Sequence, residues 1–174
     1  MRTVNLSQTR RFRAAISVRP IGVIHTPFRQ ATGTPIQPRM ARGARGTVVV
    51  FGQFQRGLKD LEGFERVWLL YLFHRARKPR LLVTPFLDNQ KRGVFSTRAP
   101  TRPNAIGMSA VRLVRIDGNS LTVADVDMLD GTPLLDIKPY VPQFDCYKVK
   151  RTGWVGSTAV RRRLADNRFQ KAVR

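Results

Sequence analysis

Short runs of apolar and β-branched residues, separated by turn-forming residues, are the main structural signal along the chain. Residues 16–28, 47–51, 107–116 and 120–127 are such runs, and their length and composition predict β-strands. The triplet Asp117-Gly118-Asn119 joins the last two runs and predicts a tight hairpin. The most apolar run, RVWLLYLF at residues 66–73, fits a fully buried strand, although its periodicity also permits a helix.

The remaining segments predict little regular structure. Residues 81–85, 93–97 and 136–140 favour further short strands, and residues 30–46 form a long loop without periodicity. Helix is expected only as one or two turns at residues 55–65, closed by Gly63, and as a short cationic helix at residues 157–169. Many short strands with little helix predict a mainly-β sandwich or barrel.

Two loops carry more polar chemistry than a connection requires. The first, STRAPTRPNAIG at residues 96–107, places Arg98 and Arg102 four residues apart among prolines. Because proline fixes its own φ and lacks an N–H group, this segment cannot be helical and makes a poor interior strand. The loop therefore reads either as a rigid clamp for an anion, a carboxylate or adenine, or as a turn with solvated arginines.

The second loop, LDGTPLLDIKPY at residues 129–140, also has two interpretations. Structurally, Asp130-Gly131-Thr132-Pro133 is a good β-turn sequence. Functionally, the same turn exposes backbone groups that could bind an amino acid or a purine edge. Asp136, Lys138 and Tyr140 then alternate along an extended segment and lie on one face. Asp136 and Lys138 could equally form an internal ion pair.

Composition narrows the possible classes of protein. A chain of 174 residues fits one domain, and no apolar run approaches the roughly 20 residues of a membrane span. The single Cys146 and the two histidines, His25 and His74, exclude a disulfide framework and favour metal-free chemistry. A cytoplasmic setting without a secretory signal is expected. The motifs of Rossmann nucleotide folds, P-loops and common hydrolases are absent.

Positive charge is concentrated at the two ends of the chain. The net charge of +21 divides into +11 for residues 1–59, +2 for residues 60–145 and +8 for residues 146–174. This pattern favours RNA or DNA as a partner, through neutralisation of phosphates; an acidic partner, a membrane surface or solubility alone are the alternatives. We expect a basic N-terminal arm at 1–15, a barrel domain at 16–145 and a basic tail at 146–174.

Four motifs resemble those of a known family: PIGVIHTPF at 20–28, GLKDLEGFERVWLLYLFHRA at 57–76, GVFSTRAPTRPNAIGMS at 93–109 and DMLDGTPLLDIKPYVPQFD at 127–145. They identify the chain, over about residues 18–145, as similar to the TsaA-like or TrmO family of S-adenosylmethionine-dependent tRNA methyltransferases. The resemblance implies a single-sheet β-barrel with short helices and a homodimer with the cofactor near the subunit interface. It also implies methylation of the N6 nitrogen of threonylcarbamoyladenosine next to the tRNA anticodon.

The resemblance also implies a set of cofactor-binding residues. These are Pro35, Ile36, Gln37, His74, Arg75, Arg98, Met108, Asp130, Gly131, Thr132 and Pro133. Two positions depart from the family pattern, since Ile36 stands where the family has arginine and Ala105 where it has proline. The first departure weakens any side-chain role for residue 36.

The identity of a proton acceptor stays open at this point. His74 and Asp130 are candidates by residue type, and His74 could instead be structural or contact adenine. Arg98 or Arg102 could hold the carboxylate of the cofactor or that of the threonyl group. The two basic ends are expected to hold tRNA, and deleting residues 1–14 and 158–174 is expected to leave cofactor affinity intact. Methyl transfer to another acceptor and a non-catalytic RNA-binding barrel that senses the cofactor are the alternatives.

Overall fold

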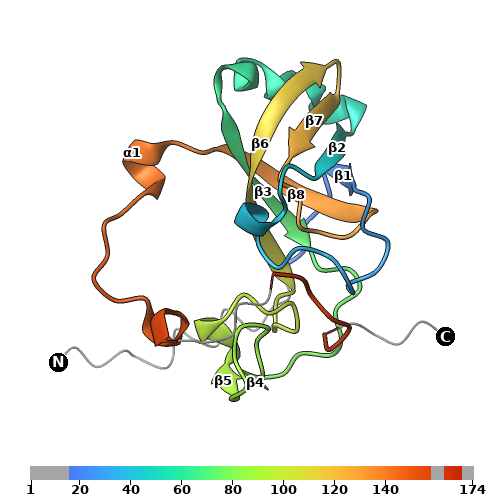
Figure 1. The fold of residues 1–174 in the computed structure, drawn as a ribbon. Helices are drawn as coiled ribbons and strands as arrows, with labels where there is room; N and C mark the ends of the chain where they lie inside the picture. Colours follow the sequence, from blue (N-terminus) through green and yellow to red (C-terminus); the bar gives the residue numbers. More distant parts are fainter. Residues whose placement is uncertain (1–15, 158–162, 170–174) are drawn as a thin grey trace, which may run out of the picture.

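The fold is a closed antiparallel barrel of six strands with a smaller lobe at one end (Figure 1). The computed structural model describes residues 16–157 and 163–169, so the expected arm at 1–15 lies outside the described residues. The barrel strands are β1 (Gly22–His25), β2 (Arg45–Val50), β3 (Arg66–Leu72), β6 (Ile106–Asp117), β7 (Ser120–Ala124) and β8 (Thr132–Pro139). The expectation of a single-sheet β-barrel is confirmed.

The strands follow the order β1-β2-β7-β6-β3-β8 around the barrel. β1 closes the sheet, because Gly22 pairs with Val50 of β2 on one side and with Leu134 of β8 on the other. The predicted hairpin is confirmed between β6 and β7, where Asp117 pairs with Ser120. Full closure leaves no unpaired edge in this sheet.

Alternate residues of each strand fill the barrel interior. In β3 the side chains of Val67, Leu69 and Tyr71 are buried, whereas Trp68 and Leu70 are only partly buried. The strand prediction for residues 66–73 is therefore confirmed, but the expectation of full burial is wrong, because the outer face of an antiparallel sheet is only partly covered. The fully buried interior residues include Ile24, Val48, Val67, Leu69, Val111, Leu121, Val123 and Leu134.

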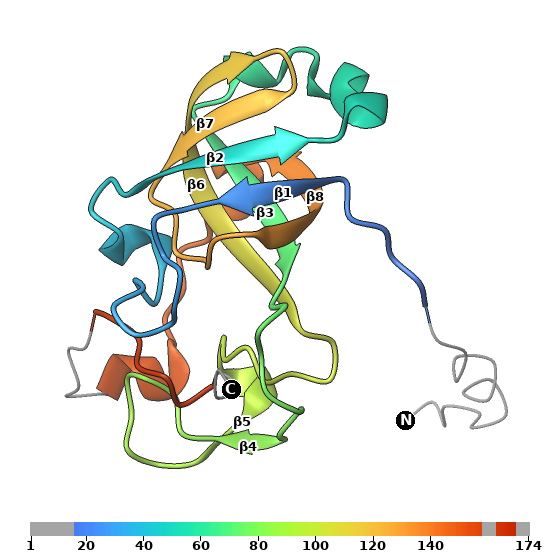
Figure 2. The same cartoon turned by 90° about the vertical axis from the view of Figure 1, so that its right-hand side faces the viewer.

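A small lobe lies beside one end of the barrel (Figure 2). It contains the two-stranded sheet of β4 (Leu82–Val83) and β5 (Arg92–Gly93). The strands predicted at 81–85 and 93–97 are therefore too long, and residues 94–96 form the 3-10 turn η5 (Val94–Ser96). A second apolar cluster of Val83, Val94, Ala99 and Phe169 holds the lobe together.

Apart from η5, helical structure in the described residues is confined to five short turns. They are η2 (Pro38–Met40), η3 (Gly52–Leu58), η4 (Leu61–Gly63), α1 (Pro142–Asp145) and η6 (Gly153–Ser157). The turns predicted at 55–65 correspond to η3 and η4, which are 3-10 rather than α-helical. Two strand predictions had wrong bounds, since only four residues of 16–28 form β1 and the strand predicted at 136–140 is the end of the longer β8.

The last described residues of the chain pack against the lobe. Residues 158–162 of the cationic helix expected at 157–169 lie outside the described residues. Within the described residues 163–169 no helix is present. Leu164 forms an antiparallel bridge with Pro35, and the N–H of Ala165 donates to the carbonyl of Thr34 at 2.8 Å. Phe169 is 7% exposed and packs in the second apolar cluster. This segment therefore belongs to the folded body.

We predict that Leu69→Ala destabilises the protein strongly, because Leu69 is fully buried in the barrel core. A loss of about 2–5 kcal/mol in the free energy of unfolding is expected in denaturant titration. Leu82→Ala is the matched control, since Leu82 is 63% exposed, and its effect should stay within about 0.5 kcal/mol. Equal losses for the two variants would contradict the inward orientation of Leu69.

Candidate functional site

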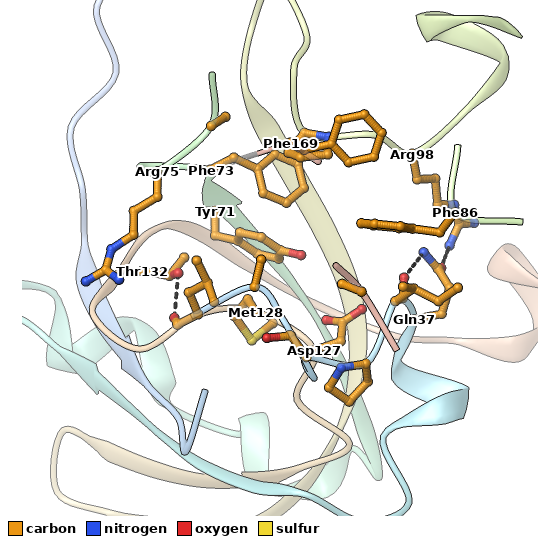
Figure 3. A pocket seen from close by; sticks show the side chains of 18 of the residues that line it. Gln37, Tyr71, Phe73, Arg75, Phe86, Arg98, Asp127, Met128, Thr132 and Phe169 are labelled. Carbon is orange, nitrogen blue, oxygen red and sulfur yellow. Dashed lines mark hydrogen bonds between the residues drawn. The ribbon is translucent and has the colours of Figure 1, made fainter. Parts of the chain in front are cut away.

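A pocket lies between the end of the barrel and the lobe, and segments distant in the sequence line it together (Figure 3). β3 and the residues after it contribute Tyr71, Phe73, His74, Arg75 and Ala76. The other lining residues are Ala31, Thr34, Pro35, Ile36, Gln37, Phe86, Arg98, Pro100, Met108, Asp127, Met128, Leu129, Thr132, Ala165, Asp166 and Phe169. The pocket thus joins the barrel, the lobe and the C-terminal segment.

Aromatic rings form much of the pocket wall. Tyr71 and Phe73 meet edge to face with 5.4 Å between ring centroids, and Phe86 and Phe169 do so at 5.1 Å. Phe73 and Phe169 lie across the pocket from Asp127 (Figure 3). Such a wall suits a flat ring or a soft cation, since aromatic faces attract positive charge.

A chain of three hydroxyl and carboxyl groups connects the barrel interior to the pocket. The Ser109 hydroxyl donates to Asp127 Oδ1 at 2.6 Å, and the Tyr71 hydroxyl lies 3.0 Å from Ser109 Oγ. Because the single hydroxyl proton of Ser109 is donated to Asp127, the Tyr71 hydroxyl is the donor to Ser109 Oγ. Tyr71 and Ser109 are buried, whereas Asp127 is half-buried and lines the pocket.

The surroundings of Asp127 favour its protonated form. Burial raises the pKa of its carboxyl group to about 7, against the opposing effects of the Ser109 hydrogen bond and of the Arg98 charge. Burial likewise raises the pKa of Tyr71 far above its ordinary value, so its hydroxyl stays protonated. Asp127 is therefore a carboxyl group poised to gain or lose a proton near neutral pH.

Gly107 makes room for this arrangement. A side chain at that position would place its Cβ 2.3 Å from Tyr71 Cε2, which is far inside van der Waals contact. The glycine lets the Tyr71 ring lie against β6, with its hydroxyl beside Ser109 two residues further along the strand. Packing against Tyr71 therefore explains why glycine follows Ile106 at the end of the first polar loop.

His74 lines the pocket, and the pKa of its imidazole is lowered. Burial and the neighbouring Arg75 charge lower the pKa of its imidazole. Its Nδ1 lies 3.4 Å from the Thr132 hydroxyl oxygen, and the Thr132 hydroxyl donates its proton to the carbonyl of Leu129 at 2.7 Å. His74 is thus a neutral ring at physiological pH, held close to β8.

Asp130, the other candidate proton acceptor, does not line the pocket. It accepts a hydrogen bond from the Thr26 N–H at 3.1 Å and lies 3.3 Å from His25 Nδ1. These contacts hold its pKa below its usual range, with the Thr26 bond as the largest cause. Its position indicates that it ties the loop before β8 to the end of β1.

The two arginines of the proline-rich loop have different positions. Arg98 lines the pocket, and its guanidinium donates to Gln37 Oε1. Arg102 points into its own loop, where Nη1 lies within hydrogen-bond distance of the carbonyls of Val94, Thr97 and Ala99, at 2.9–3.3 Å. Arg102 therefore holds the loop in shape, which neither the clamp nor the solvated-turn interpretation anticipated.

Most of the cofactor residues implied by resemblance meet in this pocket. Pro35, Ile36, Gln37, His74, Arg75, Arg98, Met108 and Thr132 line it, whereas Asp130, Gly131 and Pro133 do not. Gly131 adopts a positive φ of 71° in the turn before β8, a conformation that glycine tolerates. Asp136 and Lys138 form an exposed ion pair at 2.8 Å. An ion pair between them was one of the two interpretations that the sequence left open.

Sequence reasoning missed several pocket residues, chiefly Tyr71, Phe86, Asp127 and Phe169. Three of them, all but Phe86, carry a weak local signal. Tyr71 is a polar aromatic within an apolar strand, and Phe169 is an isolated aromatic in a basic tail. Asp127 ends a buried strand-like run, but its partner Ser109 lies 18 positions earlier.

Two further properties of the described residues bear on other classes of protein. No helix among them has the length and apolar character needed to cross a membrane. No group of three or more His, Cys, Asp or Glu side chains in the same part of the chain is placed to hold a metal ion.

Comparison with known proteins finds relatives with similar sequences. A probable S-adenosyl-L-methionine-binding protein of Pyrococcus abyssi is 56% identical over 140 residues, which cover 80% of this chain and 76% of that protein. The human tRNA (adenine(37)-N6)-methyltransferase is 37% identical over 72% of the chain, but this match covers only 30% of the human protein.

Solved structures show the same likeness. The crystal structure of TrmO from Pseudomonas aeruginosa matches 80% of this chain and 62% of its own chain, with a TM-score of 0.68 and 42% identity. The family model of the tRNA-methyltransferase O N-terminal domain matches residues 23–146. The chain therefore belongs to the family defined by the N-terminal domain of tRNA-methyltransferase O.

Proposed function

We propose that this protein is an S-adenosylmethionine-dependent tRNA methyltransferase and that the pocket between barrel and lobe is its active site. The observation that carries the proposal is the convergence of eight residues, implied by family resemblance and scattered between positions 35 and 132, on one pocket. Similarity to relatives named for binding S-adenosylmethionine and for methylating tRNA supports the cofactor and the reaction.

The chemistry of the pocket suits this cofactor. Rings of Tyr71, Phe73 and Phe86 offer faces for adenine and for the sulfonium charge. Arg98 offers a guanidinium for the cofactor carboxylate, and Arg75 lies at the opposite end of the pocket (Figure 3). When bound, S-adenosylmethionine supplies an electrophilic methyl group on its sulfonium sulfur.

Asp127 is the proton acceptor that the geometry favours. Transfer of the methyl group to an N–H nitrogen forms a C–N bond, breaks the C–S bond and leaves a proton to be removed from that nitrogen. A carboxylate with a pKa of about 7 suits this task, since general bases work best near the operating pH. His74 has a lowered pKa and Asp130 lies outside the pocket, so both are weaker candidates.

The methyl acceptor we propose is the N6 nitrogen of threonylcarbamoyladenosine next to the anticodon. The name of the human relative, a tRNA (adenine(37)-N6)-methyltransferase, supports this choice. The strongly basic composition of the chain suits a polyanionic substrate.

A homodimer with the cofactor near the subunit interface remains part of the proposal. An exposed apolar patch on paired positions of β3 and β6 supports it: Leu72 lies opposite Ile106, and Met108 is 50% exposed at the pocket rim. Exposed apolar patches of this kind often mark protein interfaces. The cytoplasmic setting likewise stays a prediction.

The proposed activity predicts transfer of a labelled methyl group from S-adenosylmethionine to tRNA that carries threonylcarbamoyladenosine. The matched control is the same tRNA without the threonylcarbamoyl group, which should accept no label. Label on both tRNAs would indicate another acceptor nitrogen. Calorimetric binding of S-adenosylmethionine without transfer to any RNA would favour a cofactor-sensing, non-catalytic barrel.

The proposed role of Asp127 predicts a pH-dependent rate. Below a pH of about 7 the carboxyl group is protonated and cannot accept a proton, so the single-turnover rate should rise through that pH to a plateau. Asp127→Asn should lower the plateau by about 10²–10⁴-fold, the usual contribution of a general base, and should remove this rise. Asp136→Asn, in the exposed ion pair, serves as the control and should keep both rate and profile.

A second readout of Asp127 does not depend on catalysis. Because the folded-state pKa lies above the unfolded value of 3.8, the unfolded state ionises first and stability falls as pH rises from about 4 to 7. Asp127→Asn should lose this part of the pH dependence of the free energy of unfolding. An unchanged dependence would contradict the raised pKa.

The C-terminal segment should contribute directly to cofactor affinity, contrary to the expectation that its deletion leaves that affinity intact. Phe169 lines the pocket and is buried, so Phe169→Ala should weaken S-adenosylmethionine binding by about tenfold or more. Val83→Ala is the control, because Val83 packs in the same apolar cluster without lining the pocket. Equal affinity in calorimetry for the Phe169 variant and the wild type would contradict this role.

A further inference from the structure

A second groove adjoins the cofactor pocket on the side of the lobe. The two hollows have Ile36, Gln37, Phe86, Arg98 and Phe169 in common. The groove then runs past Phe95 and Trp154, which the pocket does not include, and we call it the Phe95 groove. Its volume of about 620 Å³ falls within the roughly 300–1,000 Å³ typical of small-ligand sites.

The groove presents an exposed aromatic face. Phe95 is 75% exposed, although it sits in η5 directly after the buried Val94. Trp154 forms another part of the wall, and its indole N–H donates to the carbonyl of Ser96 at 2.7 Å. This bond ties η6 to the residue next to Phe95. An aromatic ring exposed in a hollow is available for stacking.

The loop that carries Phe95 is already held in shape. Arg102 bonds the carbonyls of Val94, Thr97 and Ala99, which lie on both sides of Phe95 in the sequence. The guanidinium carbon of Arg102 lies 5.9 Å from the centre of the Phe95 ring. A ring fixed in this way loses little conformational freedom when a ligand stacks on it.

The charge around the groove is positive. No Asp or Glu is found among the described residues that line it, whereas Arg98 does line it. The Arg92 guanidinium, which forms an ion pair with Asp88 at 2.7 Å, lies 5.8 Å from the Trp154 ring centre. The exposed Arg39 and Arg151 directly precede the lining residues Met40 and Thr152. Aromatic faces interleaved with arginines are the features of surfaces that bind single-stranded nucleic acid.

We propose that the Phe95 groove binds an unstacked nucleobase of the RNA substrate, with the base on Phe95 and the backbone phosphates near the surrounding arginines. The inference rests on the proposed function and adds to it a site for the substrate. The groove meets the cofactor pocket at Arg98 and Gln37, so a base in the groove lies beside the bound methyl donor.

The test compares two phenylalanines that are almost equally exposed. Phe144 on α1 is 72% exposed and does not line the groove. Phe95→Ala should weaken binding of an RNA stem–loop with a seven-nucleotide single-stranded loop by about 5- to 150-fold, the range for one base–aromatic stack. Phe144→Ala should change it less than twofold, and Phe95→Trp should restore it. S-adenosylmethionine affinity and oligomeric state should be unchanged in all variants.

Three outcomes would overturn the groove assignment. Stem–loop affinity that is equal in Phe95→Ala and the wild type shows that no base stacks there. If Phe95→Ala also loses S-adenosylmethionine affinity, the groove is part of the cofactor site. If Phe95→Ala dissociates a dimer, Phe95 is an interface residue. The proposed function can fail independently of the groove. In that case the wild-type protein neither binds S-adenosylmethionine nor transfers methyl groups, but its affinity for the stem–loop still depends on Phe95.

Discussion

Closure of the sheet between β1 and β8 is the constraint on which both the core and the pocket depend. The pairing of Gly22 with Leu134 and of Ile24 with Thr132 removes the last two free edges of the barrel. Because β8 begins at Thr132, the same pairing positions the loop that carries Asp127 and Met128. Asp130 reinforces this position through its contacts with Thr26 and His25. The interior is thus completed by the strand pair that also places the pocket.

The two apolar clusters of the protein have different functions in the site. The barrel cluster includes Tyr71, whose hydroxyl extends toward Ser109 and Asp127, and so supplies polar groups at the pocket floor. The lobe cluster includes Phe169 and packs against Phe86, and so supplies aromatic surface. Sites formed where two packed units meet are common, because each unit holds its side chains rigidly while the junction stays open to ligands. The proposed active site is such a junction.

The local sequence pattern was sufficient to predict most strands of the barrel, but it was insufficient to predict the structure of the lobe. β3, β6 and β7 follow the short runs of apolar and β-branched residues, and the hairpin between β6 and β7 follows Asp117-Gly118-Asn119. The lobe has only two-residue strands, and its cohesion comes from a cluster that joins Val83 to Phe169 across the sequence. No window of consecutive residues contains that information. Arg102 differs, because its partner carbonyls lie only three to eight residues earlier in the sequence. Its role depends on the conformation of the loop, which brings these carbonyls around the guanidinium.

The sequence by itself determined the strand periodicity, the uneven charge and, through family motifs, most of the residues that meet in the pocket. The tertiary structure alone decided which carboxyl group faces that pocket. Asp127 and Asp130 are three residues apart and belong to the same motif, yet one lies beside Ser109 of β6 and the other beside His25 of β1. Their pKa values move in opposite directions for this reason, since burial dominates at Asp127 and a backbone hydrogen bond dominates at Asp130. Long-range pairing sets those surroundings, and local sequence does not encode it.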